Sequence, residues 1–231
     1  SPGPEMLQQM TGVPTVATLP MWWQHGLPEE DGVFDDRSTL AGPVRRTVAV
    51  VAYPRISNLD EFQPLKNVPG LRLVWVRSPV QLAGLRPGED WIVLPGSKQV
   101  SGDLAWLRRQ GLDLAIARHA ATGAPVLGIC GGLQMLGEAL VDPDGHDGEA
   151  GFNGPGLGLL PLVTRYERDK RVCRSTLRFA QTRGAWAPWC GVEAAGYEIH
   201  CGMSVPHPDL PAPQVALRDA RGEAIGWQHG N

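Results

Sequence analysis

Mainly apolar runs alternate with helical patterns through the middle of the chain, and they predict strands at 47–54, 71–76, 90–97 and 125–130. The run at 47–54 is uninterrupted, which is typical of a strand buried on both faces of a parallel sheet. Helical spacing covers 103–123, with a break near Gly111, and another helix is predicted at 133–140. This alternation predicts an α/β fold with an open, mostly parallel sheet flanked by helices.

The two ends of the chain have a different pattern. Residues 4–20 resemble the end of a helix, a turn and one strand, and a polar connection follows at 24–38. We expect residues 1–43 to be the tail of a preceding domain with its linker, and residues 44–231 to form the main domain. After a turn-rich loop at 142–158, short strands are predicted at 157–168, 171–181, 191–205 and 213–231.

Composition narrows the classes of function. A hydrophobic content of 42% supports a core, and a net charge of -3 gives no basic surface for nucleic acid. No apolar run approaches the roughly 18–20 residues of a membrane span, and the mixed-sign run 165–171 predicts a solvated face. The four cysteines have no metal-ligand spacing, and the start of the chain has no export signal. We therefore expect a cytoplasmic protein without a metal site.

Cys130 stands at the junction of a predicted strand and a predicted helix, within Gly-Ile-Cys-Gly-Gly at 128–132. This is the form of a nucleophile elbow, with Cys in place of Ser. The dipole of the following helix favours the thiolate. The Gly131 N–H is the natural oxyanion donor, and the loop around Gly96 is the expected source of a second one. A small core cysteine beside close-packing glycines remains the alternative.

A cysteine nucleophile needs a base, which is usually a histidine. Of the six histidines, His119 has a helical context that predicts a solvent-facing side chain. Three others are set aside because they lie in turn-rich or N-terminal segments, namely His25, His146 and His207. His200 and His229 remain, and neither is assigned as the base on its pattern alone.

Five motifs in order carry a family resemblance. They are "VAVVAYPRISNLDEFQPL", "VLPGSKQVSGDLAWLRRQGLD", "GAPVLGICGGLQMLG", "GLGLLPLVTRYERDK" and "AAGYEIHCG". Together they resemble the glutamine amidotransferase domain of the cobyric acid synthase family, in the triad (class I) group. The match covers most of residues 47–202 and implies a flavodoxin-like sheet.

The resemblance also implies a reaction. Cys130 would attack the side-chain amide of glutamine, form a γ-glutamyl thioester and release ammonia, with Gly96 and Gly131 binding glutamine and the oxyanion. No cofactor is implied for this domain. ATP and Mg²⁺ would serve a synthetase domain, in which the ammonia amidates the b, d, e and g side chains of a cobyrinic acid a,c-diamide, the corrinoid partner.

The resemblance bears on both ends of the chain. Residues 1–43 resemble the end of that synthetase domain, and the sequence contains no G-x-x-x-x-G-K-[ST] phosphate loop. The family carries its catalytic histidine in a Gly-Thr-Tyr-Leu-His-Gly-like segment, from which the surroundings of His229 differ by one residue. We expect a truncated chain whose base lies beyond Asn231, with His229 as the other candidate. His200 is expected to have a substrate-side or interdomain role.

Other assignments remain open. Cobyrinic acid a,c-diamide synthase has a Pro-Gly-Gly-x-Pro-Glu loop, a Glu before the nucleophile and a Gly-His-Glu-Phe-His segment. Here the loop is 96–98 (Gly-Ser-Lys), Ile129 precedes the cysteine and 196–200 is Gly-Tyr-Glu-Ile-His. All three differences favour the cobyric acid synthase family. Mild departures from the first family occur at Gln99, Val100, Leu133 and Cys201. A non-catalytic binding module, or another Cys-elbow hydrolase or redox sensor, are further alternatives.

Overall fold

The computed structural model describes residues 2–18, 42–148 and 151–230. Its centre is a four-stranded parallel sheet with the strand order β2-β1-β3-β4. The strands are β1 (Arg46–Val51), β2 (Leu71–Val76), β3 (Trp91–Leu94) and β4 (Val126–Gly128). Residues 47–51 are all buried, as expected for a strand covered on both faces. The predicted open α/β sheet is confirmed.

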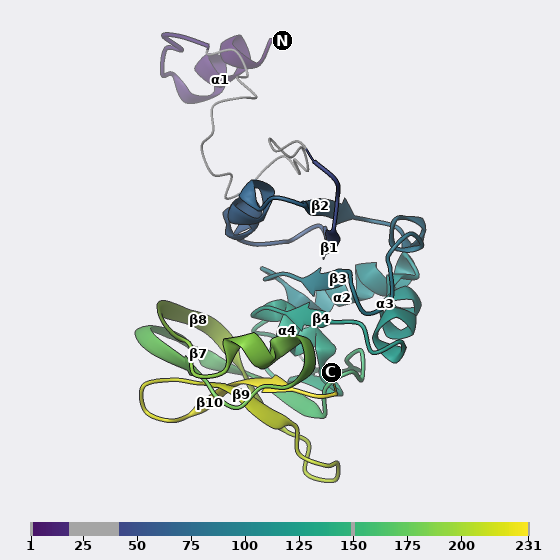
Figure 1. Ribbon diagram of the computed structural model, residues 1–231. Coiled ribbons are helices and arrows are strands. Elements are labelled where there is room, and N and C mark those ends of the chain that lie inside the picture. The colour runs from purple at the N-terminus through teal and green to yellow at the C-terminus, as the bar shows by residue number, and fades with distance from the viewer. Residues whose placement is uncertain (1, 19–41, 149–150, 231) are drawn as a thin grey trace.

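Helical segments connect these strands. The 3₁₀ helices η1 (Leu59–Asn67) and η2 (Pro79–Leu82) follow β1 and β2. The helices α2 (Val100–Arg109) and α3 (Leu112–Ala121) lie side by side between β3 and β4 in the chain (Figure 1). Gly111 separates them at a φ of 71°, where the prediction placed the break. The short helix α4 (Gly131–Leu136) follows β4 and packs on both β3 and β4.

A second, mainly antiparallel sheet forms the rest of the domain (Figure 1). Its strand order is β10-β9-β7-β5-β6, and β8 pairs with β7. The 3₁₀ helix η3 (Gly184–Trp189) connects β7 to β8. The strands are β5 (Ala139–Asp142), β6 (Phe152–Pro155), β7 (Leu162–Phe179), β8 (Glu193–Pro206), β9 (Gln214–Arg218) and β10 (Ala224–Gln228). Among the pairs that the described residues form in this sheet, β5–β7 is parallel and the others are antiparallel.

Several predicted boundaries are wrong. The helix predicted at 133–140 ends at Leu136, because residues 139–142 pair with two other strands as β5. The loop predicted at 142–158 contains β6. The strands predicted at 157–168 and 171–181 belong to the single strand β7, which continues because β8 pairs along most of its length.

The N-terminal segment contains the helix α1 (Gly3–Thr11), which buries no side chain. The presence of α1 confirms the prediction that a helix occupies the first part of residues 4–20. Residues 13–18 form no strand, contrary to the prediction. The polar connection predicted at 24–38 and His25 lie outside the described residues. The expectation that residues 1–43 are the tail of another domain stays a prediction.

Candidate active site

Cys130 is raised out of the sheet at the turn between β4 and α4. It is the N-cap residue of α4, with a φ of 50° and a ψ of −113°. Among the described residues it is one of two non-glycine residues with a positive φ, and Asn58 is the other. Such strain concentrates at functional sites, where the surrounding structure enforces it. Cys130 is exposed, which contradicts the alternative of a small core cysteine.

The glycines around Cys130 allow α4 to approach the strand ends. A Cβ on Gly132 would overlap the Leu94 carbonyl oxygen, and one on Gly131 would lie 2.9 Å from the side chains of Ser97 and Val100. A Cβ on Gly128 would lie 2.7 Å from the Gly132 carbonyl oxygen. The sequence around the cysteine therefore reflects close backbone packing, which fixes the direction of the elbow.

The loop after β3 brings Gly96 to the cysteine. A Cβ on Gly96 would lie 3.9 Å from the Cys130 Cβ, and the same position would overlap the Ser57 hydroxyl. The Ser57 N–H donates to the Gly96 carbonyl at 3.0 Å. The structure thus brings together Cys130, Gly96 and Gly131, whose roles stay a prediction.

Asp103 on α2 anchors this loop and the loop after β1. The Ser97 hydroxyl donates to Asp103 Oδ2 at 2.6 Å, and the Arg55 N–H donates to Asp103 Oδ1 at 3.1 Å. Burial raises the pKa of Asp103, although these hydrogen bonds and the Arg55 charge oppose the rise. The two loops at the carboxyl edge of the sheet therefore share one buried carboxylate as a support.

The thiol is less acidic than an ordinary cysteine. Although the residue is exposed as a whole, its Sγ lies 3.9 Å from the Ile199 carbonyl oxygen on β8. Burial of the sulfur raises the pKa of the Cys130 thiol, and the Gly131 N–H only partly offsets this rise. The Gly131 N–H at the start of the helix acts in the predicted direction, towards the thiolate, but burial has the larger effect on the pKa.

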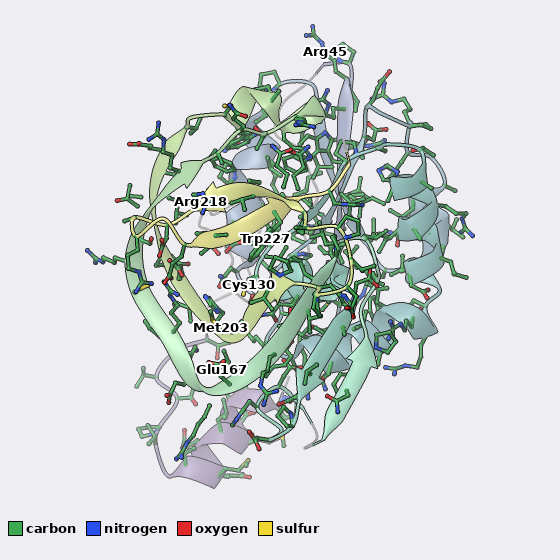
Figure 2. All side chains as sticks on the ribbon, turned by 90° about the horizontal axis from the view of Figure 1, so that it is seen from below. Arg45, Cys130, Glu167, Met203, Arg218 and Trp227 are labelled. Atoms are coloured by element: carbon green, nitrogen blue, oxygen red, sulfur yellow. The ribbon has the colours of Figure 1, made fainter. Side chains whose placement is uncertain are left out.

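One helical turn behind Cys130, a buried polar pair lies beneath the site. The Tyr166 hydroxyl donates to Gln134 Oε1 at 3.0 Å, and both side chains are buried. Gly202 on β8 lies directly against Gln134, because a Cβ there would be 2.6 Å from Gln134 Nε2. These contacts tie α4 to the strands β7 and β8 of the second sheet. Figure 2 shows Cys130 in the region that the strands of this sheet surround in that view.

His200 belongs to a charged network on β7 and β8. Its Nδ1 lies 2.9 Å from the Gly202 carbonyl oxygen, and its Nε2 lies 3.7 Å from Glu198 Oε2. The buried Glu198 also pairs with Arg171 Nε at 2.9 Å, and Arg171 in turn pairs with Asp219 at 3.1 Å. The substrate-side or interdomain role expected of His200 stays a prediction.

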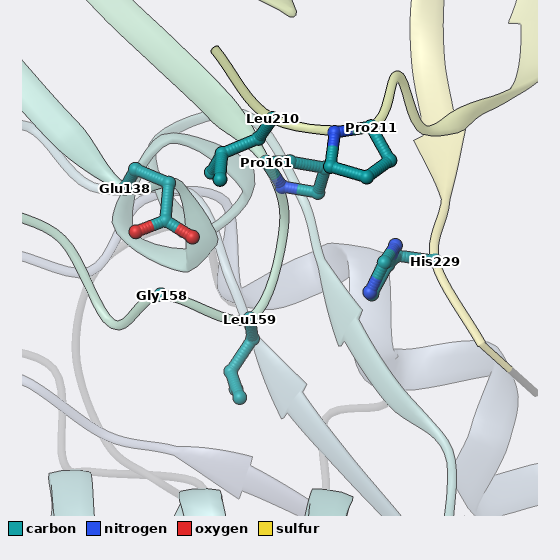
Figure 3. A pocket seen from close by; sticks show the side chains of 7 residues that line it. All are labelled: Glu138, Gly158, Leu159, Pro161, Leu210, Pro211 and His229. Carbon is teal, nitrogen blue, oxygen red and sulfur yellow. The ribbon is translucent and has the colours of Figure 1, made fainter. Parts of the chain in front are cut away.

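His229 lies in a separate hollow of about 210 Å³. In Figure 3 it faces this hollow from the segment after β10, opposite Glu138. Glu138 follows the C-terminal end of α4, whereas Cys130 caps the other end, about 9 Å away for a six-residue helix. His119 is half-buried and its Nε2 is buried, so the prediction that it faces solvent is wrong. Within the described part of the chain, no histidine is among the groups that shift the pKa of Cys130.

Sequence reasoning missed four residues of the site. Gln134 could have been found from its position four residues after Cys130, on the same helical face. Asn58 and Glu61 follow the carboxyl end of β1, where ligands of parallel sheets bind. Lys170 carried no signal, because its mixed-sign surroundings predict only a solvated face.

The fold and the elbow define a protein class in which a nucleophile is presented at a strand-to-helix turn. The family model described as CobB/CobQ-like glutamine amidotransferase domain matches residues 47–230, and the chain belongs to this family. Its curated relatives include the cobyric acid synthase of Polaromonas naphthalenivorans (strain CJ2), 65% identical over 99% of this chain and 46% of that protein. The cobyric acid synthase of Variovorax paradoxus (strain S110) is 63% identical over 100% of this chain and 48% of that protein. The chain thus spans about half the length of the curated relatives it matches.

Solved structures agree on the fold. A crystal structure titled glutamine amidotransferase has a TM-score of 0.51 and 18% identity, covering 74% of this chain and 79% of that chain. The structure of PurLQS from Thermotoga maritima has a TM-score of 0.52 and 19% identity, covering 77% and 76%. At these identities the likeness shows the fold alone.

Two features do not occur among the described residues. None of their helices has the length and apolar character needed to cross a membrane. None of their His, Cys, Asp and Glu side chains gather in a group of three or more that could hold a metal ion.

Proposed function

We propose that this chain is the glutaminase part of a cobyric acid synthase. The observation that carries the proposal is the exposed Cys130 at a strained elbow, with the backbone of Gly96 directly beside it. The names of the longer relatives support the particular enzyme, and the family supports glutamine as the nitrogen source. The four described cysteines are free, which fits the reducing cytoplasm in which we place the protein.

In the proposed reaction, the Cys130 sulfur attacks the side-chain amide carbon of glutamine and its proton passes to a base. The tetrahedral oxyanion accepts hydrogen bonds from the backbone N–H groups of Gly131 and Gly96. The C–N bond then breaks, the leaving nitrogen takes up the proton, and ammonia departs from a γ-glutamyl thioester. Water hydrolyses the thioester to glutamate and regenerates the thiol. Because the pKa of the thiol is raised, the base is essential for forming the nucleophile at neutral pH.

The ammonia is assigned to a synthetase half, which the longer relatives have room to contain. There, ATP and Mg²⁺ would activate the b, d, e and g carboxylates of (adenosyl)cobyrinic acid a,c-diamide, and ammonia would convert each to an amide. The corrinoid is therefore a partner of the whole protein, and glutamine is the substrate of this domain.

The test uses the complete natural protein with Cys130→Ala. We expect glutamine-dependent amide formation and glutamine hydrolysis to be lost, while synthesis from added ammonium salts is retained. Cys190→Ala, at another exposed cysteine, is the matched control and should keep both activities. Unchanged glutamine hydrolysis in Cys130→Ala would contradict the assignment.

A second candidate is a module that binds glutamine or a partner without catalysis. The raised thiol pKa favours it, together with the fact that no described histidine acts on Cys130. Calorimetry with L-glutamine, combined with an assay for glutamate, separates the two. Binding by the complete wild-type protein without any glutamate release would support the module and oppose the glutaminase.

A further inference from the structure

The loop that follows β3 carries a buried backbone N–H without a protein acceptor. Gly96 is buried, and within the described part of the chain its N–H donates a hydrogen bond to no residue. Buried backbone N–H groups are almost always paired, so an unpaired one needs an explanation. A Cβ on Gly96 would lie 3.9 Å from the Cys130 Cβ, so this stretch of backbone lies beside the nucleophile. The N–H is therefore available to the oxyanion of the reaction proposed above.

Two successive carbonyl groups of this loop are held by the segment after β1. The Pro95 carbonyl accepts a hydrogen bond from the Tyr53 hydroxyl, and the Gly96 carbonyl accepts one from the Ser57 N–H at 3.0 Å. The Pro95 carbonyl and the Gly96 N–H belong to one planar, trans peptide unit, so they point to opposite sides of the chain. The hydrogen bond from Tyr53 therefore also fixes the direction of the Gly96 N–H.

Tyr53 is a suitable donor for this purpose. It is the second residue after β1, and its side chain is fully buried, so the phenol ring has little freedom to move. Burial, together with the nearby negative charge of Asp103, raises the pKa of the Tyr53 hydroxyl. The hydroxyl therefore keeps its proton at neutral pH and donates. The bond-making and bond-breaking steps proposed above do not use Tyr53.

We propose that Tyr53 is a positioning residue for the oxyanion site, whose hydroxyl holds the Pro95–Gly96 peptide so that the Gly96 N–H is presented to the tetrahedral oxyanion on Cys130. This inference rests on the glutaminase function proposed above. Donors that are oriented before the reaction stabilise the transition state without a cost of reorganisation. Without the hydroxyl, the Pro95 carbonyl loses its donor and the peptide is free to rotate, which turns the N–H away from the oxyanion.

The test compares Tyr53→Phe with the wild type in the complete natural protein. Tyr53→Phe should lower kcat for glutamine hydrolysis by about 10- to 100-fold, somewhat less than the outright removal of an oxyanion donor. KM should change by less than about twofold, because the oxyanion forms only after glutamine has bound. The rate at which iodoacetamide alkylates Cys130 should stay at the wild-type value, because displacement at a saturated carbon forms no oxyanion. The circular dichroism spectrum should also stay unchanged, because the phenyl ring keeps its packing.

Two further variants serve as comparisons. Thr164→Val removes another buried hydroxyl, which bonds to the Ser204 hydroxyl at 2.8 Å between β7 and β8. Its kcat should match the wild type, because Thr164 does not contact the loop after β3. Incorporation of 4-aminophenylalanine at position 53 keeps a donor at the same end of the ring and should restore most of the kcat that Tyr53→Phe loses.

The outcomes separate this inference from the proposed function. If Cys130→Ala abolishes glutamine hydrolysis but Tyr53→Phe keeps the wild-type kcat, the role of Tyr53 alone is overturned. An equal fall in the kcat of Thr164→Val, an equal fall in the alkylation rate, or the loss of the folded spectrum in Tyr53→Phe also overturns that role, because the effect of the hydroxyl is then a general one. A 4-aminophenylalanine protein that is no more active than Tyr53→Phe does the same. A wild-type protein that does not hydrolyse glutamine overturns both proposals.

Discussion

The Tyr166 hydroxyl donates a 3.0 Å hydrogen bond to Gln134 Oε1, one helical turn behind Cys130. Tyr166 belongs to β7 of the antiparallel sheet, whereas Gln134 belongs to the helix that packs on the parallel sheet. The two groups are buried, so each depends on the other to satisfy its hydrogen-bonding capacity. The support of the elbow therefore comes from both sheets.

Tyr166→Phe should lower the free energy of unfolding by about 1–3 kcal/mol, because it leaves the buried Gln134 oxygen without its donor. Urea titration followed by circular dichroism measures this change. Tyr197→Phe removes a hydroxyl from a side chain that is 63% exposed and is the matched control. Equal stability of the two variants would show that the buried hydrogen bond contributes nothing.

Gly132→Ala should destabilise the domain by about 3 kcal/mol or more, because the new methyl group would overlap the Leu94 backbone. Gly84→Ala is the control, since a Cβ there has no neighbour within 4 Å. Urea midpoints of both variants check the prediction. A Gly132→Ala protein with the wild-type midpoint would mean that α4 does not pack this closely on β3.

The raised pKa of the Cys130 thiol predicts a distinctive pH profile of alkylation. The thiolate is the reactive form, so the rate with iodoacetamide should keep rising above the range in which an ordinary cysteine, with a pKa near 8.5, is fully ionised. Mass spectrometry of the peptide that contains Cys130 measures the rate. Glu61→Gln should move the inflection to lower pH, because it removes a negative charge. A profile with an inflection below that of free cysteine would contradict the structure.

Asp90 should contribute stability that is lost in acid. Burial alone would raise its pKa, but hydrogen bonds from Arg86 and from the Thr47 N–H, at 2.6 Å, hold it below the ordinary value. A depressed folded-state pKa stabilises the protein above the unfolded value of about 3.9 and ceases to do so as the pH falls through the folded value. Asp90→Asn should lower the free energy of unfolding by about 2 kcal/mol at pH 7.

The difference in free energy of unfolding between Asp90→Asn and the wild type should be smaller when both are unfolded with urea at pH 3 than at pH 7. Asp113→Asn on α3, at a carboxylate that is only partly buried, supplies a charge-matched comparison, and its difference in free energy of unfolding from the wild type should stay small at both pH values. If this difference for Asp90→Asn is the same at pH 7 and pH 3, the carboxylate charge of Asp90 has no stabilising role.

The parallel sheet could be predicted because its strands carry mainly apolar runs, and that of β1 is unbroken because residues 47–51 are all buried. The run over β2 matches the structure at both ends, and Gly111 marks the break between two helices. For the second sheet, the sequence predicts only separate short strands. Many residues of β7 and β8 are exposed, and their pairing over long separations leaves little local pattern.

The elbow could be predicted from Gly128, Cys130 and Gly132, because a tight strand-to-helix turn needs small residues in sequence next to the nucleophile. The charges that act on the pKa of the thiol could not be predicted. Glu61 and Lys170 are more than one hundred residues apart in the chain, and both influence the pKa of Cys130 only through tertiary structure. The pKa of the thiol was likewise beyond the sequence, since it depends on how closely β8 covers the sulfur.

The chain passes from one sheet to the other through α4, and the first turn of this helix begins at Cys130. The elbow is therefore also the connection between the two sheets of the domain. In a mutational scan, substitutions at Gly131, Gly132 or Gln134 should lower abundance and activity together, because one element serves both. Variants that separate folding from turnover should instead cluster in the loop after β1, where Ser57 packs against Gly96 beside Cys130 without joining the sheets.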